Sequence, residues 1–315
     1  MRSRTPTRRA ALTGGLAAAG ALTASVAAPG ASVPGASRPQ LLRRPYKTKA
    51  DGEEREYYLY VPAGFHSEPG KKWPVMLFLH GNGERGNGRE DLKYTMIHGP
   101  VSEAWIQGRD LPFLIIQPQL PWFNRPQPRN ARTEPPVRNA DGPPPARNYG
   151  SRPEPAMRRE EPGEQPRWAP QAGPPEGWEM IEDDLLGMVD ATVEDFRGDA
   201  DRVYLTGLSY GGFGSWHMAS KFTDRWAAVA PICGSGDNSK VEAIAEAELP
   251  TWVFQGGRDP VVKTEWVIET ARALEAAGHP EVRLTVHEDL GHNVWTRVYE
   301  GWDLYQWFLS KRRGA

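Results

Sequence analysis

The serine at position 209 has neighbours that suit a nucleophile. It lies in Gly207-Leu208-Ser209-Tyr210-Gly211, after a run of β-branched and aromatic residues and before a stretch of small residues. At a sharp turn from strand to helix, a glycine on each side lets the helix pack closely on the strand and raises the serine above the sheet. The pattern predicts a reactive hydroxyl at Ser209, but five residues are a weak signal without partners elsewhere in the chain.

A serine hydroxyl becomes reactive only with a base beside it and an acid that orients the base. In a parallel sheet such groups lie in loops at the carboxyl ends of later strands. Asp259 follows a strand expected at 251–255, and His292 follows a strand expected at 282–286. The chain order serine, aspartate, histidine therefore predicts a catalytic triad of Ser209, Asp259 and His292.

Other residues compete for the roles of base and acid. His287 is the rival base, but it ends a strand, and Gly291 gives the loop of His292 the backbone freedom that a site loop needs. The acids to weigh against Asp259 are Asp237, Asp289 and Asp303. The first follows the wrong strand, the second is too close to His292 in sequence, and the third lies in an expected helix. We therefore prefer Asp259 and His292.

A glycine-rich loop at 80–86 follows the expected strand at 74–79. Its Gly-x-Gly-x-x-Gly spacing is that of a dinucleotide site, but such a site needs a helix at the third glycine, and here a polar loop continues. We expect a nest of backbone N–H groups instead. With the N–H of Tyr210, those of Gly81 and Asn82 would form an oxyanion hole, and His80 would brace the loop.

The rest of the chain alternates between apolar runs and segments with helical spacing. Strands are expected at 57–61, 74–79, 111–117, 226–232, 251–255 and 282–286, and in the run before Ser209. Helices are expected at 91–107, 177–196, 241–247, 264–277 and 294–309, and a hairpin with its turn at Asp51-Gly52 is expected at 43–61. The alternation predicts fold class α/β, with a mostly parallel central sheet, helices on both faces and one domain over 38–315.

A Pro/Arg-rich insert at 121–177 interrupts this pattern. It holds 15 of the 30 prolines and nine arginines, with Val137 as its only valine, isoleucine or leucine. Such a segment cannot bury enough apolar surface to order itself as a core. Because its ends carry Trp122 and Trp168, one interpretation is a lid that contacts substrate, together with Trp295. A disordered insert without a role is the alternative.

The first 37 residues do not belong to the predicted fold. Arg8 and Arg9 precede an uncharged, alanine- and glycine-rich stretch, which predicts a signal peptide of the twin-arginine type and a short tail over 1–37. The alternative, a membrane anchor, fits poorly because the stretch has few large apolar residues. We therefore expect a secreted or periplasmic protein without a stable membrane anchor.

Composition excludes several classes of protein. The net charge of −2 does not indicate a nucleic-acid partner, and the single cysteine, Cys233, allows no internal disulfide. Cys233 follows an apolar run, so we expect a small buried residue rather than a nucleophile. No metal-ligand cluster is visible in the sequence, and neither a metal nor a cofactor is expected.

Five blocks of the sequence resemble the secreted α/β-hydrolase esterases. The blocks are 80–86, 207–212, 231–234, 259–262 and 291–295. The most similar groups are the phospholipase/carboxylesterase-like and polyhydroxyalkanoate-depolymerase-like families, often labelled predicted peptidases. The resemblance implies an α/β-hydrolase fold with Ser209 as nucleophile, His292 as base and Asp259 as acid. Gln255 stands where many relatives have histidine, and we expect no effect of this difference on the chemistry.

These observations predict a serine hydrolase that cleaves carboxylic esters through an acyl-enzyme. Its substrate would be a small-molecule or polymeric ester. Two alternatives remain open, namely a serine peptidase of the prolyl-oligopeptidase-like type and a non-catalytic secreted binding module on a hydrolase scaffold.

Overall fold

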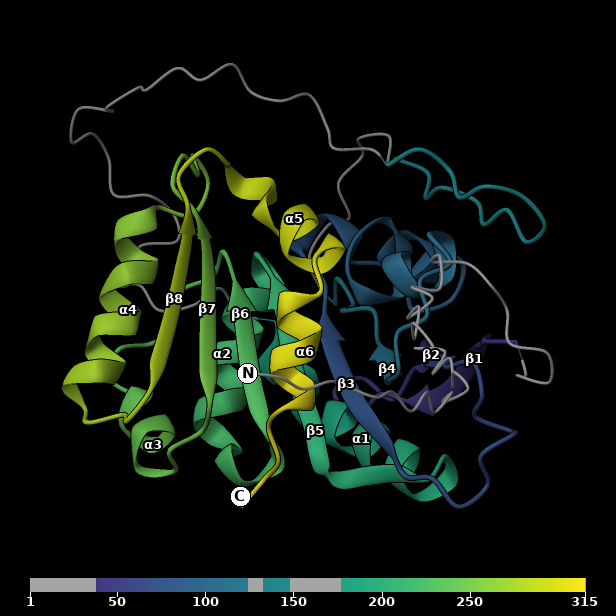
Figure 1. Cartoon of the computed structure of the whole chain (residues 1–315), viewed down its shortest axis with the longest axis horizontal. Helices are drawn as coiled ribbons and strands as arrows, with labels where there is room; N and C mark the ends of the chain where they lie inside the picture. Colours follow the sequence, from purple (N-terminus) through teal and green to yellow (C-terminus); the bar gives the residue numbers. More distant parts are fainter. Residues whose placement is uncertain (1–37, 124–132, 148–176, 315) are drawn as a thin grey trace, which may run out of the picture. The chain divides into compact units, whose positions relative to one another are not determined.

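A mixed eight-stranded sheet forms the centre of the structure (Figure 1), a computed structural model that describes residues 38–123, 133–147 and 177–314. The strand order is β1-β2-β4-β3-β5-β6-β7-β8. The strands are β1 (Gln40–Lys47), β2 (Glu54–Val61), β3 (Trp73–Leu79), β4 (Leu114–Gln117), β5 (Gly198–Leu208), β6 (Ala228–Ile232), β7 (Thr251–Gly256) and β8 (Val282–His287). The pairs β1–β2 and β2–β4 are antiparallel, and the other neighbours are parallel. The predicted mostly parallel sheet is confirmed.

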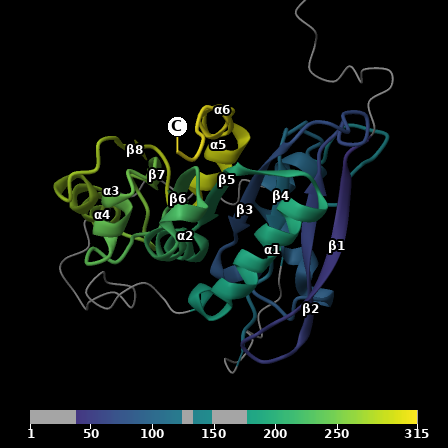
Figure 2. The ribbon, with the colours of Figure 1, turned by 90° about the horizontal axis from the view of Figure 1, so that it is seen from below.

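Helices cover both faces of this sheet because its central strands are apolar on both sides. Val75 and Leu77 of β3 belong to one core cluster, which is covered by α1 (Glu182–Asp195), α2 (Tyr210–Lys221), α3 (Val241–Glu246) and α4 (Thr264–Ala276). Met76 and Phe78 pack on the opposite face with α5 (Trp295–Glu300) and α6 (Asp303–Leu309). Figure 2 shows α5 and α6 across the sheet from α1 and α2. The expected fold class, an α/β sheet with helices on both faces, is confirmed.

Three of the expected helices are divided. The segment 177–196 forms the 3-10 helix η5 (Trp178–Ile181) followed by α1. The segment 91–107 forms the 3-10 helix η2 (Glu90–Ile97) and the one-turn π-helix η3 (Ser102–Ile106) instead of one helix. Between them, Gly99 has a φ of +92°, and Pro100 disfavours a helical conformation in the residue before it. The segment 294–309 likewise divides into α5 and α6, because Gly301 is extended, with φ −67° and ψ 170°.

Part of the Pro/Arg-rich insert lies against the body of the protein. The side chain of Glu134 accepts hydrogen bonds from Lys93 Nζ at 2.7 Å and from Tyr94 Oη at 2.9 Å. Arg147 forms an ion pair with Glu103 of η3. The described stretch 133–147 is therefore tied to η2 and η3, whereas Trp168 lies outside the described residues.

The predicted signal peptide at 1–37 also lies outside the described residues. None of the helices in the described ranges is long and apolar enough to cross a membrane.

Candidate active site

Ser209 occupies a strained turn between β5 and α2. Its φ of 52° and ψ of −115° lie in a region that residues with a β-carbon rarely adopt. The turn leaves no room for side chains on either side. A β-carbon on Gly211 would lie 1.9 Å from the carbonyl oxygen of Leu79, and one on Gly207 would lie 2.3 Å from that of Gly211. The two glycines therefore allow the close packing of helix on strand that holds Ser209 in this conformation.

The structure brings Ser209, His292 and Asp259 together. The Oγ atom of Ser209 lies 2.9 Å from Nε2 of His292, and Nδ1 of His292 lies 2.7 Å from Oδ2 of Asp259. An ionised carboxylate can only accept, so Nδ1 carries the proton and Nε2 accepts from the serine hydroxyl. The side chain of Asp259 is fully buried, and that of His292 is 19% exposed. The three side chains thus form a hydrogen-bonded row from hydroxyl to imidazole to carboxylate.

Backbone and side-chain donors hold the carboxylate of Asp259 in place. Its Oδ1 accepts hydrogen bonds from the N–H groups of Val261 at 2.8 Å and Val262 at 2.9 Å. Its Oδ2 accepts a longer bond, 3.3 Å, from Nε2 of the buried Gln255, and the same nitrogen donates to the Val262 carbonyl at 2.9 Å. Gln255 thus contacts Asp259, and the expectation that this residue has no effect on the chemistry stays a prediction.

Asp237, Asp289 and the alternative base have other contacts, and Asp303 lies in the first turn of α6. Arg297 donates to both oxygens of Asp289, at 2.8 and 2.6 Å, and its guanidinium lowers the pKa of that carboxyl to about 2. Asp237 accepts from Ser239 Oγ at 2.6 Å. Burial, helped by the nearby guanidinium of Arg297, lowers the pKa of His287. The structure thus places these groups in local contacts outside the Ser209–His292–Asp259 cluster.

The glycine-rich loop after β3 lies directly beside Ser209. A β-carbon on Gly81 would lie 3.7 Å from the β-carbon of Ser209. The buried His80 fixes the loop, because its Nδ1 donates to the Gly81 carbonyl at 2.6 Å and its Nε2 accepts the Leu120 N–H at 2.9 Å. The prediction that His80 braces the loop is confirmed. Asn82 begins the 3-10 helix η1 (Asn82–Glu84).

Trp295 stands between the imidazole of His292 and a cavity. Its ring centroid lies 5.1 Å from that of His292 and 5.4 Å from that of His98. The cavity has a volume of about 180 Å³ and is bounded by Trp295, His98, Glu103 and Glu134, among others. Burial lowers the pKa of His98 to about 4, so its imidazole is uncharged at neutral pH, whereas Glu103 and Glu134 bring carboxyl groups to the same cavity. The insert residue Glu134 therefore contributes directly to the wall of a cavity close to the candidate site.

The second tryptophan expected at the site, Trp122, lies near Tyr210. The buried guanidinium of Arg85 lies 4.6 Å from the ring centroid of Trp122 and 5.4 Å from that of Tyr210. Its Nη2 also donates to the Pro121 carbonyl at 2.7 Å. Arg85 thus joins the start of the insert to the residue that follows Ser209.

Comparison with known proteins agrees with this architecture. Residues 156–301, which include Ser209, Asp259 and His292, match the model of the dienelactone hydrolase family. A solved structure described as a thermostable esterase superposes with a TM-score of 0.57 at 25% identity, over 87% of this chain. The chain has the α/β-hydrolase fold. It spans 63% of the length of that esterase chain.

Other solved structures share the α/β-hydrolase fold at lower identity. A ferulic acid esterase superposes with a TM-score of 0.54 at 18% identity, over 86% of this chain and 100% of its own. The S-formylglutathione hydrolase from Staphylococcus aureus superposes with a TM-score of 0.55 at 12% identity, over 89% of this chain and 100% of its own. The comparison with curated proteins gave no significant match. The resemblance to esterases inferred from the sequence is thus supported at the level of the α/β-hydrolase fold.

Proposed function

We propose that this α/β-hydrolase cleaves carboxylic esters with Ser209 as nucleophile, His292 as general base and Asp259 as orienting acid. The observation that carries the proposal is the unbroken hydrogen-bonded row of these side chains, at 2.9 and 2.7 Å, next to the strained turn of Ser209. Structural hydrogen bonds alone would not require a serine in so unfavourable a backbone conformation.

In the proposed mechanism, Nε2 of His292 takes the hydroxyl proton while Oγ of Ser209 attacks the ester carbonyl carbon. The carboxylate of Asp259 stabilises the imidazolium that forms. The imidazolium then gives its proton to the departing alcohol oxygen, which leaves an acyl group on Ser209. A water molecule, deprotonated by His292, attacks this acyl-enzyme, and the imidazolium returns the proton to Oγ of Ser209 as the acid product leaves.

The negative charge on the carbonyl oxygen would be stabilised by backbone N–H groups of Tyr210, Gly81 and Asn82. The proposal is supported by the position of Gly81 beside Ser209 and by the start of α2 at Tyr210, since N–H groups at a helix N-terminus point away from the helix. Each such donor is worth about 10²–10³ in rate.

We further propose that one side of the ester lies along Trp295 and enters the adjoining cavity. Trp295 borders both His292 and the cavity, so a group attached to the reacting carbonyl would reach the cavity past its indole. Trp122 and Trp168 remain candidates for further contact with a small or polymeric ester. Export by the leader over 1–37 completes the proposal, and N-terminal sequencing of protein recovered outside the cytoplasm tests it.

The direct test is Ser209→Ala with p-nitrophenyl acetate as substrate. Because triad residues act as a unit, kcat should fall by about 10⁶. Ser220→Ala is the matched control, since Ser220 lies in the same helix α2 and donates to the His217 carbonyl at 3.0 Å. Hydrolysis by Ser209→Ala at a rate near that of the control would refute the assignment. Parallel assays with acyl esters of increasing length and with a peptide amide measure the preference for esters.

A further inference from the structure

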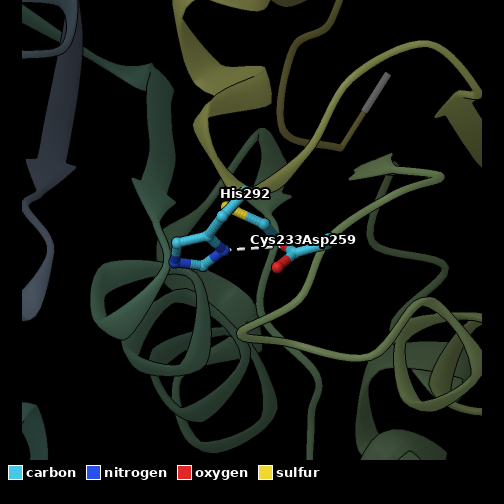
Figure 3. Close-up of side chains that lie close together, drawn as sticks. All are labelled: Cys233, Asp259 and His292. Carbon is cyan, nitrogen blue, oxygen red and sulfur yellow. Dashed lines mark hydrogen bonds and ion pairs between the residues drawn. The ribbon is translucent and has the colours of Figure 1, made fainter. Parts of the chain in front are cut away.

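A thiol, a carboxylate and an imidazole meet beside Ser209. The sulfur of Cys233 and one ligand atom each from Asp259 and His292 all lie within 4.8 Å of one another. Figure 3 shows the three side chains together, with the hydrogen bond between His292 and Asp259 drawn. They follow three neighbouring strands, β6, β7 and β8, so parallel pairing brings their loops to one edge of the sheet. The mechanism proposed above uses only two of the three groups.

The backbone holds the sulfur of Cys233 in this place. Cys233 has a φ of 41°, a conformation that favours glycine, although the residue carries a side chain. Its N–H donates to the Phe254 carbonyl of β7 at 2.8 Å, and the Ser209 N–H donates to the Ile232 carbonyl just before it at 2.8 Å. The position of the thiol is therefore set by the same packing that sets the position of Ser209. Backbone strain of this kind is common at functional sites.

The donor set suits a soft or borderline divalent cation. Thiolate, imidazole and carboxylate are ligands of Zn²⁺, and thiolate favours soft cations in general. Tetrahedral bonds of about 2.0–2.3 Å require donor atoms to lie about 3.3–3.6 Å apart. The three donor atoms already lie within 4.8 Å of one another, so side-chain rotations could bring them to these separations. One thiolate and one carboxylate would neutralise a doubly charged ion, which removes the main cost of burying it.

We propose that Cys233, Asp259 and His292 bind one soft divalent cation, such as Cd²⁺ or Zn²⁺, and that its binding stops hydrolysis. The Cys233 thiol loses its proton to solvent when the metal–sulfur bond forms. The metal takes Nδ1 of His292, so the proton of that nitrogen moves to Nε2. A protonated Nε2 cannot accept the hydroxyl proton of Ser209, and the base is lost. Binding itself is independent of the proposed function, whereas inhibition depends on it.

The sulfur of Cys233 is fully buried. The side chain of His292, 19% exposed, gives the cation its route to the buried donors.

The test uses the full chain titrated with CdCl₂ in a buffer free of thiols and chelators. Cys233 is the only cysteine, so an ultraviolet cadmium–thiolate charge-transfer band reports on this residue alone. We expect the band to saturate at one Cd²⁺ per chain, the hydrolysis rate to fall in parallel, and EDTA to reverse both changes. Ser209→Ala should keep the band although it lacks activity, which separates failure of this proposal from failure of the proposed function.

Four variants test the ligands, each compared with its own rate without metal. Cys233→Ala should lack the band and need at least tenfold more Cd²⁺ for half inhibition, and Cys233→Ser serves as a second variant of native size should the first not fold. His292→Ala should weaken the band titration at least tenfold. His287→Ala, a nearby histidine outside the cluster, should change neither. Equal inhibition of wild type and both Cys233 variants, or an unchanged cadmium affinity in His292→Ala, would overturn the proposal.

Discussion

Gln255 offers the most informative single substitution, because it touches the acid rather than the serine. Its amide nitrogen lies 3.3 Å from Oδ2 of Asp259 and 2.9 Å from the Val262 carbonyl. Gln255→Met keeps the size and removes both hydrogen bonds. Asp259 would still accept from Val261, Val262 and His292. The substitution therefore weakens the orientation of the acid without abolishing it.

The expected loss of rate follows from these distances. A hydrogen bond to a charged group contributes about 1.5–3 kcal/mol, and 3.3 Å is longer than the usual N–H···O range, so we take the low end. About 1.4 kcal/mol corresponds to a tenfold fall in kcat. The lost bond to the buried Val262 carbonyl should also lower the free energy of unfolding by about 1–3 kcal/mol. We expect KM to change little, because Gln255 lies behind the acid.

The assay is steady-state hydrolysis of a chromogenic ester together with thermal unfolding. Gln117→Met is the matched control, since Gln117 is also buried at a strand end and donates to Thr95 Oγ1 at 2.9 Å. The control should lose stability and keep kcat. Gln255→Glu should lose more rate than Gln255→Met, because a second carboxylate would then face Asp259. A kcat for Gln255→Met equal to wild type, or a fall as large in the Gln117 control, would refute the reasoning.

Three further predictions concern the turn, the cavity and the insert. Gly211→Ala should abolish activity and destabilise the fold by at least ~3 kcal/mol, because the new β-carbon would lie 1.9 Å from a backbone oxygen. Gly187→Ala in α1 is the control: its β-carbon would enter open space, so denaturant melts should show the fold stabilised by ~0.5–1 kcal/mol. His98 has a depressed pKa of about 4, so the unfolded chain binds the extra proton between pH 6.5 and 4. Acidification through this window should cost about 3 kcal/mol of stability, and His98→Asn should remove that part of the pH dependence. Glu134→Ala removes the contact of the insert with Lys93, so it should raise KM for bulky esters and leave KM for p-nitrophenyl acetate unchanged. Equal changes of KM for both substrates would contradict a role of Glu134 in the cavity wall.

Local patterns in the sequence were enough to predict the elements near the proposed triad. The glycines at 207 and 211 predicted the turn because their requirement is steric and acts within a few residues. The order of Ser209, Asp259 and His292 predicted that they would meet, because each follows a strand of a parallel sheet. The expected helix at 91–107 was wrong at Gly99-Pro100, although a proline disfavours a helical conformation in the residue before it.

Contacts between distant segments could not be predicted from the sequence. Neither the bond from Gln255 to Asp259 nor the anchoring of Glu134 on Lys93 has a local signature, because each depends on side-chain positions fixed by packing elsewhere. The approach of Cys233 to the acid and the base, from loops on neighbouring strands, is of the same kind. The sequence by itself determined which residues could react and on which elements they lie, through backbone sterics and hydrophobic periodicity. Only the tertiary structure decided which side chains lie within bonding distance, because that depends on how whole strands and loops pack together.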